Sequence, residues 1–273
     1  MKNLNIYITE KLKISKPKPK GKVQYTLFPN SKRELKEMIA EEIKKNGNNC
    51  SLNHIDTSKI TNMNELFVHS KFNGDISQWD VSNVYNMSYM FEYSEFDGDI
   101  LEWNVSKVKN MHGMFKSSKF NGDIFSWNVS NVEDMGYMFL QSIFNQDISD
   151  WDVSNVKDMD SMFKGSKFND DISNWDVSKV TDMEFMFCDS DFNKPIGKWN
   201  VINVKNMWGM FAGSQFNQDI ADWNIIKCTQ MDHMFKDSKF NKDISNWVIK
   251  PNCSSFDMFN NCDIKEDFKP KRL

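Results

Sequence analysis

The side chains with the clearest capacity for chemistry are aspartates that recur every 24 residues. Stacked carboxylates could share calcium ions, because calcium prefers oxygen ligands. Each aspartate also follows a Phe-Asn turn, where it could instead accept backbone amide hydrogens. Pro195 interrupts the column and Gly-rich ion loops are missing, so we expect the structural role and no metal or cofactor, with calcium as the alternative. The column consists of Asp75, Asp99, Asp123, Asp147, Asp171, Asp219 and Asp243.

Catalytic arrangements find little support in the other reactive residues. His54, His69, His112 and His233 occupy unrelated positions of the repeating unit, so no two of them share a geometry suited to metal binding or Cys-His chemistry. A glycosidase needs two carboxylates in different environments, whereas identical coils give every aspartate nearly the same one. We therefore expect a protein that is not an enzyme.

The positions that hold these residues belong to one short unit copied many times. Tryptophan recurs at the same step, and columns of isoleucine, phenylalanine, methionine and valine keep it too. A period in the twenties indicates a solenoid, in which each unit buries its apolar side chains against its neighbours. The tryptophans of this column are Trp79, Trp103, Trp127, Trp151, Trp175, Trp199, Trp223 and Trp247.

Each unit is expected to contain a strand and a short helix. In the unit that spans residues 72–95, alternation at Trp79 and Val81 is typical of a short half-buried strand. Val84, Met87 and Met90 then follow helical spacing, and Asn86 is suited to be the N-cap. The sequence predicts an α/β repeat with one short parallel strand and one short helix per coil.

The chain divides into four parts on this basis. Residues 1–30 form a basic segment and linker, and residues 31–51 contain a predicted capping helix, with a Ser31–Glu34 capping box and an end near Gly47. Residues 52–263 form about nine coils, and residues 264–273 form a basic tail. The capping helix is expected to cover the first coil, and the repeat pattern decays at Val248 and Pro251 as a carboxyl-terminal cap would.

Charge and cysteine content limit the possible partners and locations. Residues 1–50 hold 12 Lys or Arg and 5 Asp or Glu, a net charge of +7, and residues 51–273 hold 22 and 33, a net charge of −11. An acidic solenoid argues against a nucleic-acid partner.

The cysteines are scattered and odd in number, which favours reduced thiols. They are Cys50, Cys188, Cys228, Cys253 and Cys262. With no predicted export signal, anchor or apolar span, we expect an intracellular or virion-associated protein rather than one on a cell surface or inserted in a membrane.

Polar positions that flank the tryptophan column are the expected interaction face. Short acidic and amide side chains on a flat sheet suit hydrogen bonding to protein or glycan, and a merely solvated face is the alternative. The first column is Gln78, Glu102, Ser126, Asp150, Asn174, Lys198, Asp222 and Asn246; the second is Asp80, Asn104, Asn128, Asp152, Asp176, Asn200 and Asn224. Trp208 lies outside the tryptophan column at a position that is otherwise mostly polar, so it is a further candidate contact residue, with partial packing as the alternative.

The unit resembles that of the BspA-like leucine-rich-repeat surface proteins, whose repeats occur in bacteria, large DNA viruses and phages. The clearest copy is DISDWDVSNVKDMDSMFKGSKFN, Asp147 to Asn169, and the resemblance covers residues 52–263. It implies a right-handed, leucine-rich-repeat-like solenoid that adheres to or binds partners through a repetitive face, with no catalytic residues.

The leading hypothesis is a non-enzymatic structural or protein-interaction solenoid that presents a repeated polar face to a macromolecular partner. One alternative is an adhesin that binds glycans or a host surface. Another is a virion-associated protein, because Met1 to Lys11 resembles the short leader of some phage proteins, with Ile8-Thr9-Glu10 similar to a processing signal. The partner and the oligomeric state are left open.

Overall fold

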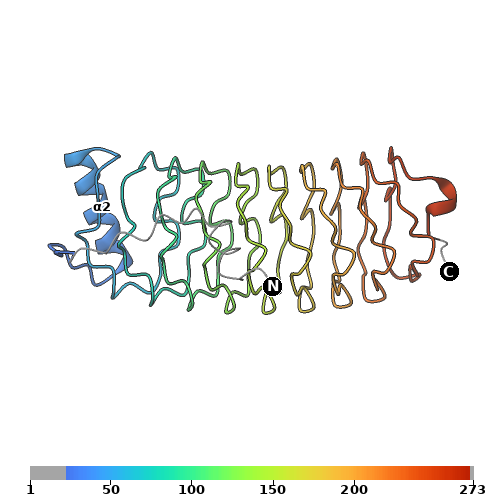
Figure 1. Cartoon of the computed structure of the whole chain (residues 1–273), viewed down its shortest axis with the longest axis horizontal. Helices are drawn as coiled ribbons and strands as arrows, with labels where there is room; N and C mark the ends of the chain where they lie inside the picture. The colour runs from blue at the N-terminus through green and yellow to red at the C-terminus, as the bar shows by residue number, and fades with distance from the viewer. Residues whose placement is uncertain (1–22, 271–273) are drawn as a thin grey trace, which may run out of the picture.

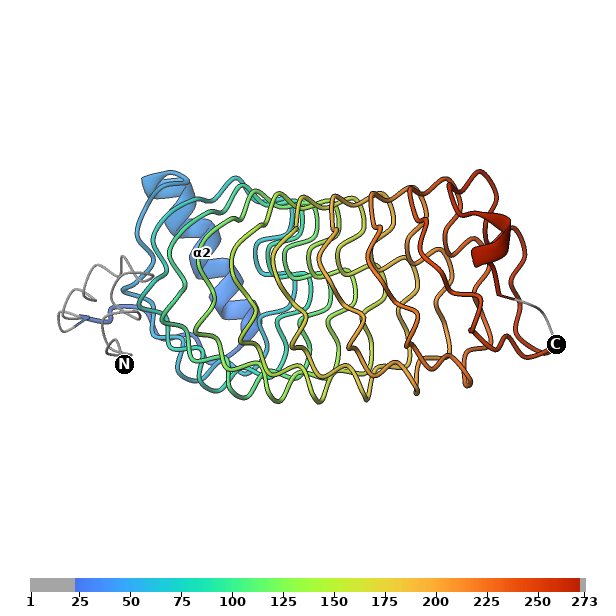
Figure 2. The same ribbon diagram turned by 45° about the vertical axis from the view of Figure 1, so that its right-hand side comes forward.

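The computed structural model describes residues 23–270 as an elongated solenoid, in which successive coils stack along one axis (Figure 1). Helix α2 (Lys32–Asn46) lies at one end of the stack, and the short 3-10 helix η1 (Glu266–Phe268) lies at the other. Figure 2 shows the coils as a series of loops around a common axis. The predicted leader and most of the cationic amino-terminal segment fall on residues 1–22, and the end of the basic tail falls on 271–273; these predictions lie outside the described residues.

One continuous hydrophobic core runs through the coils, as the sequence predicts. The eight tryptophans that recur every 24 residues are each only 3–4% exposed. Rings of equivalent residues stack with nearly parallel planes: the centroids of Trp79 and Trp103 are 6.4 Å apart, and those of Phe91 and Phe115 are 5.6 Å apart. Offset stacking of this kind adds to the free energy gained by burying the rings. The core therefore depends on contacts between neighbouring coils, and a single coil would leave its apolar side chains exposed.

A hydrogen bond fixes each indole ring of this column within the core. The Trp151 Nε1–H donates to the Ile124 carbonyl at 3.2 Å. The same bond, to the carbonyl 27 residues earlier, recurs at 3.0–3.2 Å for Trp79, Trp103, Trp127, Trp175, Trp199, Trp223 and Trp247. A buried N–H needs a partner, so the bond sets the depth and orientation of the ring.

The predicted strand around Trp79 does not form, because this part of each coil consists of tight turns. The Trp79 amide donates to the Ile76 carbonyl at 3.1 Å, and the Val84 amide donates to the Val81 carbonyl at 2.9 Å. Aspartate and asparagine side chains next to these turns accept backbone amides, which competes with an extended backbone. Bridges of β type lie elsewhere, at the column predicted to hold helix N-caps: parallel bridges join Asn62, Asn86, Asn110, Asp134, Asp158, Asp182, Asn206, Gln230 and Ser254 in succession.

The predicted short helix is also replaced by turns. Tyr89 and Tyr93 have φ angles of 55° and 51°, in the left-handed region, which an α-helix cannot contain. The Met90 amide donates to the Met87 carbonyl three residues earlier, at 3.2 Å. Asn86 still accepts a backbone amide, that of Ser88 at 2.9 Å, so the predicted cap exists without its helix. Helical spacing of the apolar residues thus reports which side chains face the core and not the backbone conformation.

Along residues 87–93 of this coil, the backbone hydrogen bonds to the next coil share one direction. The N–H groups of Met87, Tyr89, Phe91 and Tyr93 donate to carbonyls of the next coil at 2.8–2.9 Å. Equivalent bonds recur from the coil of Met63 to the coil of residues 254–261. Every second peptide group here lies along the solenoid axis. Its N–H faces the carboxyl-terminal end of the stack and its carbonyl faces the amino-terminal end.

Helix α2 begins and ends where the sequence predicts. The Ser31 side chain accepts the Glu34 amide at 3.2 Å, while the Glu34 side chain accepts the Asn30 amide at 2.8 Å. The carboxyl end of the helix is closed by Gly47, whose φ of 84° suits glycine and whose amide donates to the Ile43 carbonyl at 2.8 Å.

The buried side of α2 covers the first coil. Leu35 and Ile39 belong to the same hydrophobic core as the coils. The Lys32 Nζ donates to the carbonyl and the side-chain oxygen of Asn64 at 3.1 and 2.6 Å. The helix therefore meets the carbonyl edge of the first coil with a hydrogen-bond donor.

At the opposite end, the repeating path continues beyond Val248 and Pro251, where the sequence predicts decay of the pattern: the Lys265 amide donates to the Asn241 side-chain oxygen at 3.2 Å, as equivalent residues do in earlier coils. Ile264 is buried, and the Phe268 carbonyl at the end of η1 accepts the Ile244 amide at 3.0 Å. The tail thus closes part of the last coil.

Candidate interaction surface

The first candidate surface, named here the turn face, comprises the exposed side chains of residues 75–82 and their equivalents in later coils. Here the recurring aspartates bind backbone. The carboxylate of Asp171 accepts the Ser173 amide at 2.9 Å, and the hydrogen bonds donated by Ser173 hold the pKa of Asp171 below its usual value. Asp75, Asp99, Asp147, Asp219 and Asp243 make the equivalent bond. The geometry favours the structural role.

A metal-binding arrangement is not seen around these aspartates. Within residues 23–270, no group of three or more His, Cys, Asp or Glu side chains is placed to hold a metal ion. Calcium binding by the column stays a prediction, and calorimetry with millimolar calcium tests it.

The predicted partner-binding residues lie on the turn face, in turns and not on a strand. Most are exposed, whereas Gln78 and Asp80 are partly buried. The column that begins with Asp80 also accepts amides two residues further on, as Asp152 does from Ser154 at 3.1 Å. The equivalent bond occurs at Asp80, Asn104, Asn128, Asp176, Asn200 and Asn224. Glu102, Asp150, Asn174 and Asp222 complete the set of predicted residues on this face and are exposed.

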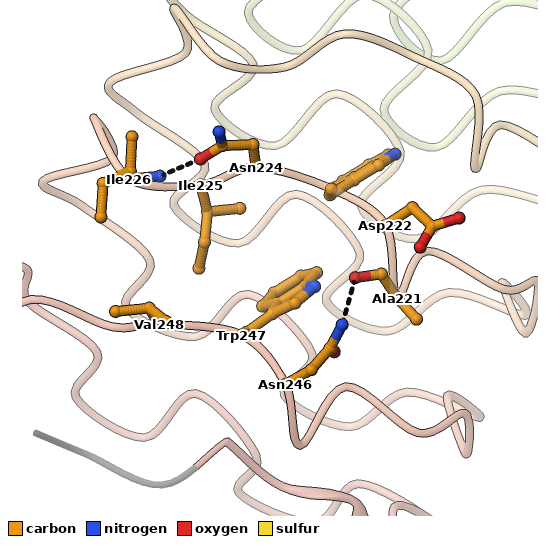
Figure 3. A pocket seen from close by; sticks show the side chains of 9 residues that line it. Ala221, Asp222, Asn224, Ile225, Ile226, Asn246, Trp247 and Val248 are labelled. Atoms are coloured by element: carbon orange, nitrogen blue, oxygen red, sulfur yellow. Dashed lines mark hydrogen bonds between the residues drawn. The ribbon is translucent and has the colours of Figure 1, made fainter.

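Shallow grooves separate neighbouring coils on the turn face. Figure 3 shows one of them, with a volume of about 450 Å³. The Asn246 Nδ2 donates across it to the Ala221 carbonyl at 3.1 Å, and the Ile226 amide donates to Asn224 at 3.2 Å. The Trp247 ring in its wall is 3% exposed, so the groove offers polar atoms and little aromatic surface.

A ladder of asparagine side chains joins successive coils beside the turn face. The Asn145 amide donates to the side-chain oxygen of Asn121 at 2.9 Å, and Asn169 repeats the bond to Asn145. The series runs at 2.8–2.9 Å through Asn73, Asp97, Asn121, Asn145, Asn169, Asn193, Asn217 and Asn241. These side chains hold coils together through their Oδ1 oxygens.

The second candidate surface, named here the bridge face, comprises the outward side chains of residues 86–93 and their equivalents from 62–69 to 254–261. Its residue types change from coil to coil. At the position of Ser88 the later coils carry His112, Gly136, Asp160, Glu184, Trp208, Asp232 and Phe256. Since the backbone hydrogen bonds are the same in each coil, the fold does not dictate these side chains.

Trp208 lies on the bridge face and not among the other predicted residues. Its ring packs between Phe185 and His233, at centroid distances of 5.2 and 6.5 Å. Phe256 follows His233 at 5.7 Å and is 65% exposed. The Trp208 Nε1 and the His233 Nδ1 are buried without a hydrogen-bond partner. We name Phe185, Trp208, His233 and Phe256 the Trp208 cluster.

Carboxylates precede the Trp208 cluster along the bridge face. Burial raises the pKa of Asp158, Asp160 and Glu184, and repulsion between neighbouring carboxylates raises it further. The Asn206 Nδ2 donates to Glu184 at 2.8 Å and to Asp182 at 3.2 Å. Negative charge is therefore concentrated in the middle coils of this face.

A second aromatic group lies at the other side of these carboxylates. The Lys116 Nζ lies 5.7–5.9 Å from the ring centroids of Tyr89, Tyr93 and Tyr137, and 2.8 Å from a Glu92 oxygen. The hydrogen bond to Glu92 raises the pKa of Lys116. Burial raises the pKa of Tyr137 to about 12.

Sequence reasoning missed most of the bridge face. It singled out Trp208 only because that tryptophan breaks the tryptophan column. Phe185 and His233 occupy the neighbouring column and Phe256 lies near the end of the repeat, so neither periodicity nor a motif marks them. The available signal was the lack of a shared residue type at these two columns.

Comparison with known proteins places the chain in a family of repeats. No curated protein and no solved structure matches the chain. The sequence matches the family described as "Mycoplasma protein of unknown function, DUF285" over residues 33–143, 92–191, 126–214 and 166–269. These overlapping matches together run from α2 through the last coil. The chain therefore belongs to the DUF285 family of repeat proteins.

Proposed function

We propose that this solenoid is a non-enzymatic binding protein that holds a protein partner along its bridge face. The observation that carries the proposal is the contrast between a uniform backbone and non-uniform outward side chains on this face. Solenoids use extended surfaces of this kind for recognition, because each coil contributes its own side chains to one long contact. Exposed aromatic residues such as Phe256, with partly buried ones such as Trp208, are the residue types that dominate protein interfaces.

The same proposal includes the absence of catalysis. His112 contacts Asp134 at 3.0 Å, and this hydrogen bond raises the pKa of His112. A nucleophile in hydrogen-bond reach of that pair would be needed for acyl transfer, and Gly136 and Tyr89 are its neighbours instead. The arrangement suits a stabilising ion pair.

Two surface variants of the full-length chain test the proposal. A bridge-face variant carries Glu184→Gln, Trp208→Ala and Phe256→Ala, and a matched turn-face variant carries Glu102→Ala, Asp150→Ala and Asp222→Ala. We expect affinity capture from the source organism, followed by mass spectrometry, to recover a partner with the wild type and the turn-face variant but not with the bridge-face variant. Equal recovery by all three chains would contradict the proposal.

A glycan ligand on the turn face is the second candidate, because the BspA-like surface proteins that the repeat resembles adhere to or bind partners through a repetitive face. The specific observation in its favour is the groove in Figure 3, whose rim carries the exposed side chains of Asp222, Asn224 and Asn246. Amide and carboxylate groups of this kind hydrogen-bond sugar hydroxyls. A glycan array separates the candidates: binding that the turn-face variant loses would favour the adhesin. From the same resemblance we propose leucine-rich-repeat-like, right-handed winding of the coils.

For location, we propose a reducing compartment or a virion. Within residues 23–270, which include all five cysteines, no disulfide forms, and burial, acting with the neighbouring Asp189, raises the pKa of Cys188 to about 12, which keeps it unreactive. No helix in the described part of the chain is long and apolar enough to cross a bilayer. Mass spectrometry of the native protein tests the virion alternative, because a processed leader would leave Lys11 as the first residue.

A further inference from the structure

We propose that the Trp208 cluster docks a lysine- or arginine-rich extended segment of the protein partner, with a cationic side chain held against the Trp208 ring and the carboxylates beside it. This inference rests on the proposed function and specifies the chemistry of the partner. Four observations carry it: two internal cations on the same face, the environment of Trp208, the adjacent carboxylates and the charge of the coils.

The bridge face already binds one of its own lysines in this way. Lys116 lies among three tyrosine rings and forms an ion pair with Glu92, and both partners of that pair are largely buried. A cation near aromatic rings is attracted by their negative faces, more strongly where water is excluded. The tyrosine group is therefore filled by the chain itself.

The Trp208 cluster receives an internal cation at one edge only. The Lys164 Nζ lies 4.1 Å from the centroid of the Phe185 ring. Among the described residues, no lysine or arginine lies over Trp208, although tryptophan attracts cations more strongly than tyrosine or phenylalanine does. The Trp208 ring is partly exposed and leads to the exposed ring of Phe256. Because the planes of Phe185 and His233 are tilted by 41° and 36° to the indole, an incoming side chain can reach the Trp208 ring only from its solvent side.

The carboxylates next to Trp208 favour a partner that carries positive charge. Glu184 occupies the same column one coil earlier, a separation of about 4.8 Å between stacked backbones. A single ammonium or guanidinium group can therefore contact both the carboxylate and the indole ring. Asp160 lies in the same column one coil before Glu184. Asp182 and Glu184 both accept hydrogen bonds from the Asn206 side chain. A cation there would relieve the repulsion that this stack of carboxylates contains.

The charge of the coils favours the same partner at long range. Residues 51–273 carry a net charge of −11, from 22 Lys or Arg and 33 Asp or Glu. Such a surface attracts a cationic segment before contact and repels an acidic one. Binding should therefore weaken as salt concentration rises.

The probe for the test is a short synthetic peptide of alternating lysine and serine, compared with its glutamate counterpart. The chain has nine tryptophans, and the eight of the periodic column donate their indole N–H to backbone carbonyls in the core. In the full-length chain labelled with ¹⁵N at tryptophan, we expect the lysine peptide to shift the Trp208 indole signal and leave the core signals in place. Trp208→Phe assigns that signal.

Variants measure the contribution of each group to peptide affinity. Trp208→Ala is expected to weaken binding of the lysine peptide about tenfold, a typical effect for a largely desolvated cation–aromatic contact. Glu184→Gln removes charge with little change of shape and is expected to weaken binding about threefold. Phe28→Ala is the matched control, because Phe28 is 55% exposed and lies before the first coil, away from the cluster. Circular dichroism confirms that each variant is folded.

Three outcomes would overturn the inference. These are equal affinity for the glutamate peptide, an affinity for the lysine peptide that neither Trp208→Ala nor Glu184→Gln changes, and binding that appears only when residues 1–22 are removed. The last would assign the cluster to the chain's own amino-terminal lysines. None of these outcomes decides whether the bridge face captures a partner in the source organism, which the two surface variants test separately.

Discussion

The turn face and the bridge face belong to the same coils, but their polar side chains have different roles. On the turn face, aspartates and asparagines such as Asp152 close local turns through their own backbone amides, and the same residue types recur in nearly every coil. On the bridge face, backbone groups bond to the next coil directly, and the side chains that project from them vary from Gly136 to Trp208. Uniform side chains in a repeat therefore indicate a structural requirement, and varied ones indicate freedom that binding can use.

The largest expected effect comes from the core below the turn face. Trp151→Ala should lower the free energy of unfolding by about 3–5 kcal/mol, because it leaves a large cavity and the Ile124 carbonyl loses its donor. Trp151→Phe keeps most of the apolar volume and should lower it by about 1–3 kcal/mol through the unpaired carbonyl. Urea denaturation measures both. Equal effects of the two changes would mean that the lost apolar volume contributes nothing, and an unchanged stability of Trp151→Phe would mean that the hydrogen bond contributes nothing.

A smaller effect tests the backbone of the bridge face. Gln141 is exposed with a φ of 52°, so Gln141→Gly should leave stability unchanged or raise it by up to about 1 kcal/mol. Gln141→Val should lower it by about 1–2 kcal/mol, because a β-branched residue tolerates left-handed backbone poorly. In the helix that sequence spacing predicts, glycine would instead destabilise by about 1 kcal/mol. Thermal unfolding of the two variants decides between these backbones.

Removing one turn-closing side chain should have an effect of about 1 kcal/mol. Asp152→Ala leaves the Ser154 amide without its acceptor, which lowers stability, while Asp152→Asn keeps an oxygen at the same place and should change little. Asp150→Ala is the matched control, because Asp150 is exposed on the same turn face and lies in the column that makes no recurring turn bond. If Asp152→Ala weakened partner capture without any loss of stability, the turn face would be a binding surface after all.

The smallest expected effect is a pH dependence on the bridge face. Because the hydrogen bond to Asp134 raises the pKa of His112 above 6.5, the folded chain binds this proton more tightly than the unfolded chain does. The resulting stability is present below the ordinary histidine pKa of about 6.5 and is lost as pH rises through the raised folded value.

Melting temperatures between about pH 6 and pH 8.5 measure this effect. The wild type should gain more stability on acidification than His112→Gln does. His69→Gln serves as control. His69 lies on the same bridge face, and its ring stacks on Tyr93. Identical pH profiles of His112→Gln and the wild type would remove His112 from the account.

Much of the core was predictable from sequence, because burial requires an apolar residue at the same place in each coil. The spacing of Trp79, Ile76 and Met87 therefore located the buried positions, and Ser31 with Gly47 located α2. Backbone conformation was not predictable in the same way. Residues with side chains, such as Tyr89 and Gln141, adopt positive φ because hydrogen bonds to the next coil hold them there, and no local sequence preference reveals such a constraint. Glycine, aspartate and asparagine, which favour this backbone, were a local signal in only some coils, such as Gly113, Gly209 and Asp257 in one column and Gly165, Asp189 and Asn261 in the other.

The candidate site was predictable only in part. A break in a column revealed Trp208, but its partners depend on which neighbouring columns share the outward side of the coil. That geometry follows from the turns of the bridge face. The predicted short helix would have arranged these columns differently. The exposed residues of the turn face were located correctly, yet their hydrogen bonds to backbone became evident only once the turns were known.

The hydrogen bonds between coils on the bridge face share one direction, with carbonyl oxygens at the end beside α2 and amide hydrogens at the end beside η1, whereas bonds such as that from the Tyr85 amide to the Thr61 carbonyl run the other way. Along the bridge face, two copies meeting at like ends would oppose donors to donors or acceptors to acceptors, so a two-fold symmetric contact between these edges is disfavoured. Only a head-to-tail contact would continue the bonding, and Lys32 already donates to one carbonyl at the edge that such a contact would need. The helix at that end therefore limits the length of the rod to its own coils.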